Sequence, residues 1–373
     1  MKYVVQIFTG GWKNPLYKTE DIIQRLDHVM SMIDLSGVII GWNLDSHMYK
    51  DIHEFLKARG VKMYLWLPAF SEIGELAEGD LAKNLFGTSG NYQLQEGESF
   101  QFYCPSSKKN HDILMNIYDT YFADCGFEGV FLDKVRGQSF VTGAEDIFGC
   151  CCDRCKEKLK EKGCDIDDYA RFVKDKGIPE SLTIRRFDHK GVLFKYAQTK
   201  MFFKAKRTLC SEEVVHLIDA FHKKNLLVGL DLYAPFLCNL VGQDYEVLTK
   251  AADFVKPMMY RMTNAPAGVG FETHAFQDVF DLKDESYNII DCMNVTGTEF
   301  LEEQLNAIPD DLKKKTYPGL EINYREDIAR TDPKYIRKSI HCFADCGIEH
   351  MVLSWDVMLA PDSHIEAASE FQK

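Results

Sequence analysis

Gly129-Val130-Phe131-Leu132-Asp133-Lys134-Val135-Arg136 is the segment that most clearly indicates the class of fold. It begins as an apolar, β-branched run, which is typical of a strand buried on both faces, and it ends in a carboxylate and two cations. A helix end with a glycine, Phe122-Ala123-Asp124-Cys125-Gly126, precedes it, and the same five residues return as Phe343-Ala344-Asp345-Cys346-Gly347. Because glycine commonly ends a helix, both copies indicate a helix that leads into a buried strand.

Short apolar runs of this kind occur eight times, each followed by polar or aromatic residues and then by a helical pattern. The predicted strands are residues 3–8, 37–44, 62–67, 129–135, 227–232, 254–260, 316–322 and 351–356. Helices are predicted between them, for example at residues 21–32 and 51–58. Eight such units predict an α/β fold, a closed (β/α)8 TIM barrel.

The chain has more residues than this barrel needs, since a typical barrel uses about 250 and the chain has 373. The surplus lies in two insertions, residues 137–225 after the fourth strand and 263–315 after the sixth, and helices are predicted at 153–162 and near 193–209. Both insertions follow strands, so we expect them over the C-terminal face of the barrel. No Pro- or Ser-rich linker is present, so residues 1–373 are predicted to form one barrel domain.

The composition restricts the class of partner and compartment. With 44 basic and 57 acidic side chains the net charge is −13, which disfavours nucleic acid and anionic membranes as partners. No apolar run is long enough to span a bilayer, and the opening residues, Lys2 to Phe8, have the alternation of a strand rather than of a signal peptide. The 12 cysteines are therefore expected in a reducing, cytoplasmic setting, as free thiols or metal ligands. A homo-oligomer is compatible with this composition.

Three acidic residues follow predicted strands and are the candidate catalytic residues: Asp133, Asp231 and Glu321. A single acid of this kind is most often part of a salt bridge or a loop cap. Three acids at one end of a barrel repel one another unless cations or chemistry use them. Glycoside hydrolysis needs such a group, with one carboxyl protonated as an acid and another ionised as nucleophile or base.

Aromatic, basic and amide side chains at the same strand ends are the candidate substrate contacts. Flat aromatic faces can pack against sugar rings, although an aromatic residue at a strand end is individually more often part of the core. The predicted substrate-binding residues are Trp42, Trp66, Lys134, Arg136, Tyr233, Lys256, Tyr260, Arg261, Asn323, Trp355 and Asp356. The expected partner is a small carbohydrate substrate, because no carbohydrate-binding module or linker is present.

A cysteine cluster predicts a metal site in the first insertion. Cys150, Cys152 and Cys155 have the C-x-C-x2-C spacing, which lets three thiolates reach one tetrahedral ion, and Cys104 after the third strand is the natural fourth ligand. A reduced cysteine-rich loop without metal is the alternative. Four thiolates leave no open coordination position, so the predicted cofactor is a structural zinc ion.

These cysteines resemble the structural zinc cluster of family 42 β-galactosidases, which are barrels of the same kind. The stretches 129–136 and 255–260 resemble a broader group of glycoside-hydrolase-like barrel proteins. The resemblance implies a carbohydrate-active barrel with a C-terminal active site, and Glu321 matches the seventh-strand nucleophile position of family 42.

The sequence also departs from these families. The Asn-Glu pair that family 42 has after its fourth strand is absent, and Leu132-Asp133 stands there instead. Asp133 occupies the nucleophile position of α-amylase-like and α-galactosidase-like barrels, but the amylase Arg two residues earlier is missing. Asp133 is therefore predicted to be essential, while its role as nucleophile or acid stays open.

Two other classes of function are compatible with these residues. Lys256 lies on the sixth strand, where class I aldolases form a Schiff base, so a lyase is one alternative; a non-catalytic carbohydrate-binding barrel is another. No G-x-G-x-x-G loop, P-loop or H-E-x-x-H motif occurs, so neither an organic cofactor nor a catalytic metal is predicted. The stretches after the seventh and eighth strands lack the glycines that would favour a phosphorylated substrate.

Overall fold

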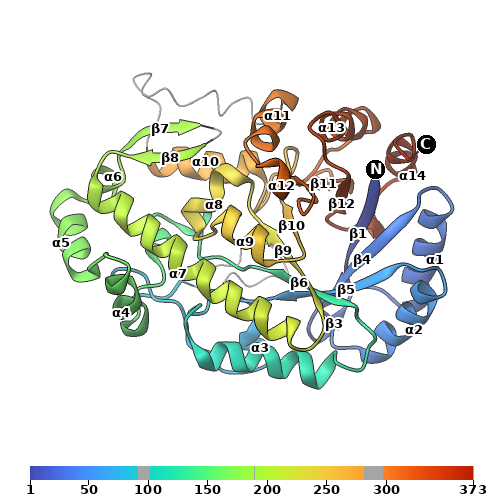
Figure 1. Cartoon of the computed structure of the whole chain (residues 1–373), viewed down its shortest axis with the longest axis horizontal. Coiled ribbons are helices and arrows are strands. Elements are labelled where there is room, and N and C mark those ends of the chain that lie inside the picture. The colour runs from blue at the N-terminus through green and yellow to red at the C-terminus, as the bar shows by residue number, and fades with distance from the viewer. Residues whose placement is uncertain (91–100, 189, 281–296, 373) are drawn as a thin grey trace.

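The computed structural model describes residues 1–90, 101–188, 190–280 and 297–372, with the backbone alone for 276–280. Its centre is a sheet of parallel strands in the order β10-β9-β6-β5-β4-β1-β12-β11 (Figure 1). The strands are β1 (Lys2–Phe8), β4 (Leu35–Gly41), β5 (Lys62–Pro68), β6 (Gly129–Asp133), β9 (Leu227–Leu232), β10 (Phe254–Pro257), β11 (Gly319–Glu321) and β12 (His350–Ser354). Each of the eight predicted strands is present, so the predicted TIM barrel is confirmed.

The sheet curves until its two ends meet. Between β10 and β11, single parallel bridges join Val255 to Thr316 and Met258 to Gly319. On the other side of β11, the last strand β12 pairs in turn with the first strand of the chain, with Lys2 opposite His350. The barrel is therefore nearly closed, with its thinnest pairing between β10 and β11.

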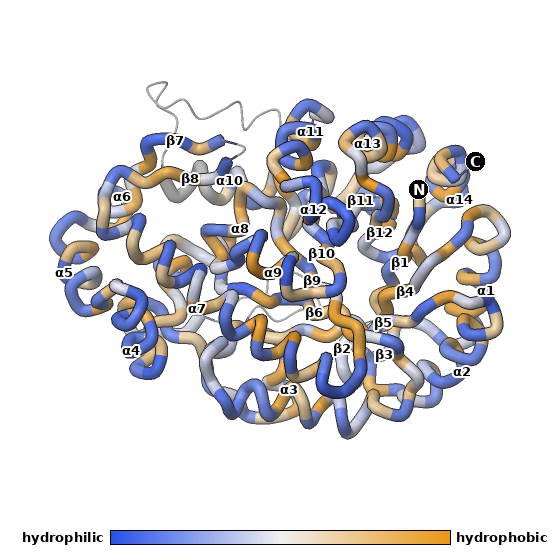
Figure 2. Tube along the Cα trace, viewed as in Figure 1, coloured by the Kyte–Doolittle hydropathy of each residue, from blue (hydrophilic) through white to orange (hydrophobic). Residues whose placement is uncertain are grey.

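Helices surround the barrel because each has one apolar face. In α1 (Thr19–Met30) the buried residues Ile22, Leu26 and Val29 lie on one side, and hydrophobic and hydrophilic residues alternate along the outer helices (Figure 2). The other helices of the barrel layer are α2 (Ser46–Lys57), α3 (Lys108–Tyr121), α8 (Pro235–Val241), α9 (Tyr245–Ala251), α13 (Pro333–Asp345) and α14 (Asp362–Ser369). Within the described residues, no helix combines the length and apolar character that a bilayer crossing requires.

The repeated five-residue segment does end helices, as the sequence indicated. Gly126 follows α3 with φ of 83°, and Gly347 follows α13 with φ of 80°. A Cβ atom on Gly126 would lie 2.3 Å from Nδ1 of His53. Both the left-handed backbone and this close approach require glycine, and each chain turn leads directly into the next strand, β6 or β12.

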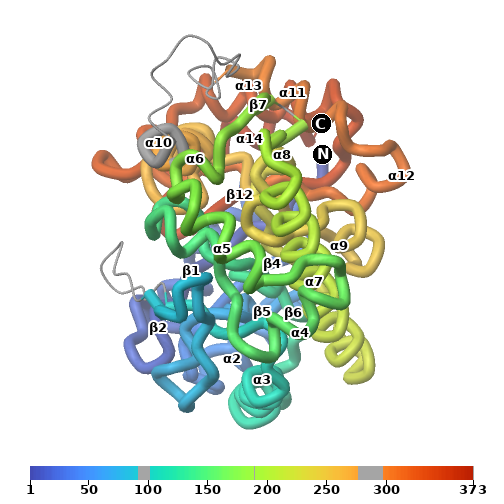
Figure 3. Tube along the Cα trace, turned by 90° about the vertical axis from the view of Figure 1, so that its left-hand side faces the viewer, coloured from blue at the N-terminus to red at the C-terminus, as the bar shows by residue number. Residues whose placement is uncertain are grey.

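The first insertion forms a helical layer on one side of the barrel (Figure 3). Its elements are α4 (Asp153–Glu161), α5 (Ile166–Lys176), α6 (Ile178–Ser181), the hairpin of β7 (Ile184–Asp188) and β8 (Gly191–Phe194), and α7 (Ala197–His222). The predicted helix near 193–209 thus begins later and continues further, because residues 191–194 pair in the hairpin. Short elements occupy other strand-end loops: the hairpin of β2 (Gly10–Gly11) and β3 (Asn14–Pro15), and three-residue 3-10 turns such as Ile73–Glu75.

The second insertion begins with α10 (Val269–Phe280) and continues, after residues 281–296 that lie outside the described part, with α11 (Thr298–Asn306) and α12 (Asp310–Lys313). Before α10, residues 263–267 cross the end of the barrel. Thr263 bridges Ala329, and Asn264 N donates to the Ile328 carbonyl at 2.7 Å. The loops after β10 and β11 are thereby joined above the strand ends.

Candidate active site

A pocket of about 130 Å³ opens at the C-terminal ends of the barrel strands, and we call it the mouth pocket. Seven of the predicted site residues line it: Trp66, Asp133, Lys134, Arg136, Asp231, Tyr260 and Trp355. The rest of its lining is Gln6, Met258, Thr263, Ala265, Pro266, Ala267 and Ile328. The structure thus brings together two of the three predicted carboxylates with aromatic and cationic neighbours.

Asp133 is the last residue of β6 and is held by two donors. Its Oδ2 accepts a hydrogen bond from Trp66 Nε1 at 3.1 Å, and its Oδ1 accepts one from the Lys134 backbone at 2.5 Å. Trp66 lies on the adjacent strand β5, where Pro68 is the residue opposite Asp133. Asp133 forms no ion pair with any described residue, so N–H donors alone stabilise its carboxylate.

Asp231 and Lys256 form a buried ion pair beneath the mouth pocket. The two residues lie opposite each other on β9 and β10, and Lys256 Nζ is 2.8 Å from Asp231 Oδ2. Nζ also donates to Gln6 Oε1 at 2.9 Å and to the Tyr260 hydroxyl at 2.8 Å. Three acceptors therefore surround the fully buried ammonium group.

The two members of this pair respond differently to burial. Burial raises the pKa of Asp231 to about 7, with a further rise from the Asp133 carboxylate, although Lys256 acts in the opposite direction. Burial by itself lowers the pKa of Lys256, but the Asp231 carboxylate and the Tyr260 hydroxyl outweigh it and raise that pKa. Lys256 is therefore a cation at neutral pH, and Asp231 exchanges its proton near neutrality.

Asp133 and Asp231 are neighbours by strand register. Leu132 of β6 pairs with Leu230 of β9, and the two aspartates come one residue later on each strand. Neighbouring strands lie about 4.8 Å apart, so side chains at matching positions face the same space. The sequence predicted that these acids would converge, and the register gives the reason.

Lys134 contributes a second buried ion pair at the edge of the mouth pocket. Its Nζ lies 2.6 Å from Oε1 of Glu72, which belongs to the loop after β5. Both residues adopt left-handed backbone conformations, with φ of 52° for Lys134 and 65° for Glu72. Residues other than glycine rarely adopt this backbone conformation. Strained positions of this kind concentrate at functional sites.

Arg136 is the second cationic side chain in the lining of the mouth pocket. Its guanidinium group lies 4.5 Å from the ring centre of Tyr233 and 4.9 Å from that of Phe102. One Nη atom donates to the carbonyl of Gly137 at 2.9 Å. The side chain also borders a small cavity beside Cys150, so Arg136 lies between the mouth pocket and the cysteine cluster.

Glu321 does not belong to the described lining of the mouth pocket. It is fully buried, and its Oε1 accepts a hydrogen bond from the Met262 backbone at 2.5 Å. Burial raises its pKa to about 7, while the Met262 N–H and the cation of Arg261 lower it. Arg261 itself points to the outer helix α13, where it donates to Ser339 and covers the ring of Tyr335.

The remaining predicted residues lie around the pocket rather than in its described lining. Asn323 Oδ1 accepts a hydrogen bond from the Trp355 backbone at 3.2 Å, and Asp356 accepts one from the Tyr17 hydroxyl at 2.9 Å. Tyr233 donates to Glu272 at 2.6 Å. Trp42 packs edge-on against Trp66, with ring centres 6.1 Å apart. These residues therefore hydrogen-bond to or pack against residues around the mouth pocket and do not belong to its described lining.

Several residues at the site were not predicted from the sequence, among them Gln6, Glu72 and Ile328. Gln6 is a polar residue inside the apolar strand β1. Because a buried polar side chain needs a hydrogen-bond partner, this position in the sequence indicates a polar contact. Glu72 lies in an irregular loop, where no periodicity reports the direction of a side chain. Ile328 reaches the pocket through the pairing of its loop with residue 264, which depends on distant parts of the chain.

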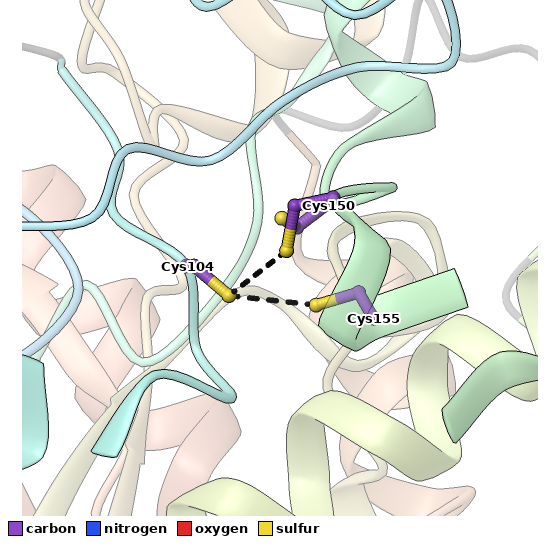
Figure 4. A group of neighbouring side chains, drawn as sticks. Cys104, Cys150 and Cys155 are labelled. Carbon is purple, nitrogen blue, oxygen red and sulfur yellow. Dashed lines mark hydrogen bonds between the residues drawn. The ribbon is translucent and has the colours of Figure 1, made fainter. Parts of the chain in front are cut away.

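The cysteine cluster is assembled as predicted. Every pair of sulfur atoms from Cys104, Cys150, Cys152 and Cys155 lies within 4.8 Å. Figure 4 shows Cys104, Cys150 and Cys155 gathered at this cluster. Cys104 Sγ lies 3.6 Å from Cys152 Sγ and 3.5 Å from Cys155 Sγ. Sulfur atoms bound to one tetrahedral zinc ion are about 3.8 Å apart, from Zn–S bonds of about 2.3 Å. The cluster could therefore hold a metal ion.

The comparisons with known proteins identify the fold. No family model matches the chain, and no curated protein matches it. The PgaB (BpsB) glycoside hydrolase domain from Bordetella bronchiseptica is similar in structure, with a TM-score of 0.66 and 14% identity over 100% of this chain and 99% of that one.

Two chitinases are more distant. A class V chitinase from Pseudomonas fluorescens Pf-5 has a TM-score of 0.48 and 11% identity, over 100% of this chain and 99% of that one. The Group II chitinase catalytic domain 2 of Ostrinia furnacalis has the same TM-score and identity, over 100% and 97%. The likeness to the Bordetella domain shows the barrel fold that these strands form.

Proposed function

We propose that the protein is a glycoside hydrolase that cleaves a small glycoside in the mouth pocket. One observation carries this proposal: Asp133 and Asp231 line the same pocket in different electrostatic surroundings. Asp133 accepts hydrogen bonds from two N–H groups. Burial, by contrast, raises the pKa of Asp231 to about 7. Two carboxyl groups with separate protonation behaviour are what glycoside hydrolysis requires. The Bordetella glycoside hydrolase domain of the same fold supports the proposal.

The surroundings suggest a role for each acid. Asp231 in its protonated form donates a proton to the leaving glycosidic oxygen, and the ionised Asp133 attacks the anomeric carbon. Asp231, now a carboxylate, then accepts a proton from the water that hydrolyses the glycosyl ester. Carboxyl groups about 5–5.5 Å apart work in this way with retention of configuration. Their neighbouring places on adjacent strands favour this short separation over the longer inverting one.

The walls of the pocket fit a sugar. Trp66, Tyr260 and Trp355 supply aromatic surface, and the volume of about 130 Å³ supports a small glycoside as substrate. We assign Glu321 no direct role in the reaction, because its carboxylate contacts the Met262 backbone and it is not in the described lining of the pocket.

The test is a panel of α- and β-linked 4-methylumbelliferyl glycosides with the wild type, Asp133→Asn and Asp231→Asn. Each substitution is expected to lower kcat/KM by about 10²- to 10⁴-fold, as the loss of acid–base groups does. Asp124→Asn, at an exposed position after α3, is the matched control. Folded Asp133→Asn and Asp231→Asn variants with the wild-type rate would overturn the proposal. Glycan binding without turnover would support the carbohydrate-binding alternative.

The lyase alternative is disfavoured by the surroundings of Lys256. A Schiff base requires a neutral amine, but Asp231 and Tyr260 raise the pKa of this lysine despite its burial. Its ammonium group is also fully engaged with three acceptors. Borohydride treatment with carbonyl compounds is expected to leave Lys256 unmodified in mass spectra, and a stable adduct would revive the lyase reading.

We also propose that the four cysteines bind a structural zinc ion. Cys104 comes from the loop after β5, and the other three come from the loop after β6 and the start of α4. A bound ion would tie these two loops together, which fixes the insertion beside the mouth. With four sulfur ligands the ion has no free position for water or substrate, so its contribution is to stability.

A further inference from the structure

We infer that the mouth pocket recognises a glycan bearing a carboxylate, such as a uronic acid residue, and that Arg136 is the side chain that binds it. This inference rests on the proposed function, since it names the substrate class of the same pocket. It is carried by the burial of Arg136 and by its lack of an ion-pair partner among the described residues.

Arg136 differs from Lys134, which lines the same pocket, and from Lys256, which lies beneath it. Lys134 is ion-paired with Glu72 and Lys256 with Asp231. Arg136 is only 6% exposed, yet no acidic side chain among the described residues forms an ion pair with it. Its single hydrogen bond to a described residue goes to the carbonyl of its neighbour Gly137.

A buried guanidinium group without an acidic partner is costly to maintain. Removal of a charge from water costs several kcal/mol unless a partner of opposite charge and hydrogen bonds replace the lost water. Arg136 carries five N–H donors in a planar fork, so most of them are available to a ligand. The best match to that fork is a planar anion such as a carboxylate, which accepts two parallel hydrogen bonds.

The aromatic rings hold the fork in place before any ligand binds. Tyr233 and Phe102 lie within cation–π distance of the guanidinium group. Tyr233 is itself fixed by its hydroxyl contact with Glu272. A donor group that is already oriented loses little entropy on binding, which favours affinity and specificity.

The other unpaired charge of the pocket is Asp133. Asp133 and Arg136 line the same pocket. The mouth pocket therefore presents one anion and one cation that have no ion-pair partner among the described residues. The anion is the carboxylate that the proposed reaction uses. The Arg136 side chain donates no hydrogen bond to either aspartate, so its donors remain available to bind a negatively charged sugar substituent.

The experiment compares 4-methylumbelliferyl glycosides that differ only at C6. Glucuronides and galacturonides carry a carboxylate there, and glucosides and galactosides carry a hydroxymethyl group. For the wild type, the uronide of the accepted configuration is expected to have a kcat/KM at least 10-fold above its neutral counterpart. Arg136→Gln is expected to reduce this ratio to near one, and Arg136→Lys, which keeps the charge without the fork, to an intermediate value.

Arg59→Gln is the matched control, because Arg59 also covers an aromatic ring, Phe55, but lies at the exposed end of α2. Its uronide-to-neutral ratio is expected to equal that of the wild type. Circular dichroism checks that each variant is folded. If Arg136→Gln does not fold, the ratio for Arg136→Lys decides the question.

The outcomes separate this inference from the proposed function. Equal or better turnover of neutral glycosides by the wild type would overturn the inference and leave the hydrolase proposal standing. An equal loss for both substrates in Arg136→Gln would also overturn it, since Arg136 would then only balance the charge of the aspartates. If neither substrate is cleaved, calorimetry with methyl glucuronide and methyl glucoside decides: carboxylate-dependent binding that Arg136→Gln abolishes supports the inference without the hydrolase, and its absence refutes the inference.

Discussion

Trp66 Nε1 donates a hydrogen bond of 3.1 Å to Oδ2 of Asp133, across the adjacent strands β5 and β6. The indole of Trp66 thus combines two tasks at the mouth pocket, because it forms part of the wall and also orients the carboxylate. A hydrogen bond to a charged acceptor contributes about 1.5–3 kcal/mol.

Trp66→Phe is expected to lower kcat about 10-fold, because the ring remains while the donor to Asp133 is lost. The measurement is kcat on the best glycoside of the panel. Trp42→Phe is the control, since Trp42 is also buried and its Nε1 has no partner among the described residues. A kcat loss of the same size in both variants would show that the ring contacts matter and the hydrogen bond does not.

The rate is expected to fall as the pH rises through about 7. Burial raises the pKa of Asp231 to about 7, and the protonated form is the one that donates to the leaving group. The alkaline limb of the kcat profile reports this group. The Asp231→Asn variant is tested on an aryl glycoside with an activated leaving group, and its residual activity is expected to show no fall of kcat with rising pH. If the alkaline fall persists unchanged, another residue is responsible for it.

Lys256→Met is expected to lower the free energy of unfolding by about 3–5 kcal/mol, because it leaves the buried Asp231 carboxylate without its cation. Urea denaturation at about pH 8.5, above the pKa of Asp231 of about 7, measures the change. The double variant Lys256→Met/Asp231→Leu removes both charges and is expected to recover most of the loss. If the double variant is as unstable as the sum of the two single variants, the ion pair is not the cause.

Glu321→Gln is expected to flatten the pH dependence of stability. The folded-state pKa of Glu321, about 7, lies above its ordinary value of 4.5 because of burial. The folded protein therefore binds a proton that the unfolded chain has released, and stability is lost as the pH rises from about 4.5 to 7.

The glutamine variant keeps the acceptor for Met262 and cannot ionise, so it is expected to gain up to about 3 kcal/mol over the wild type at pH 7.5 and little at pH 4. Denaturation at a series of pH values tests this. Glu326→Gln, an exposed neighbour, provides the baseline, and parallel curves for all three proteins would contradict the prediction. Activity of the same variant reports separately whether Glu321 takes part in the reaction.

Cys104→Ser is expected to remove the zinc ion and to lower Tm by at least about 5 °C, because the site would lose one of its four ligands. Elemental analysis gives the zinc content per chain, and calorimetry gives Tm. Cys125→Ala replaces a buried thiol outside the cluster and is expected to keep its zinc. Full zinc content in Cys104→Ser would refute the four-cysteine site.

The sequence was sufficient to predict the barrel because its strands are buried on both faces and appear as continuous apolar runs. It was also sufficient to place Asp133 and Asp231 together, since parallel strands end at one face and both acids follow such runs.

It was not sufficient to decide the direction of each strand-end side chain. Glu321 lies at an equivalent place on β11, yet it contacts the backbone of residue 262 instead of joining the described pocket lining. That direction depends on the backbone path after a three-residue strand. The pairing of Lys134 with Glu72 was equally hidden, because it joins two irregular loops far apart in the chain.

The pairing of β1 with β12 has a consequence for biosynthesis. Lys2 pairs with His350, so 350 − 2 = 348 positions separate the partners. During translation the first strand has one edge unpaired until the last strand emerges. Gln6 follows on that first strand and Trp355 follows the last one, and both line the pocket. Pairing between strands so far apart in the sequence predicts a slow closing step, in which the parts of the pocket wall formed by Gln6 and Trp355 come together.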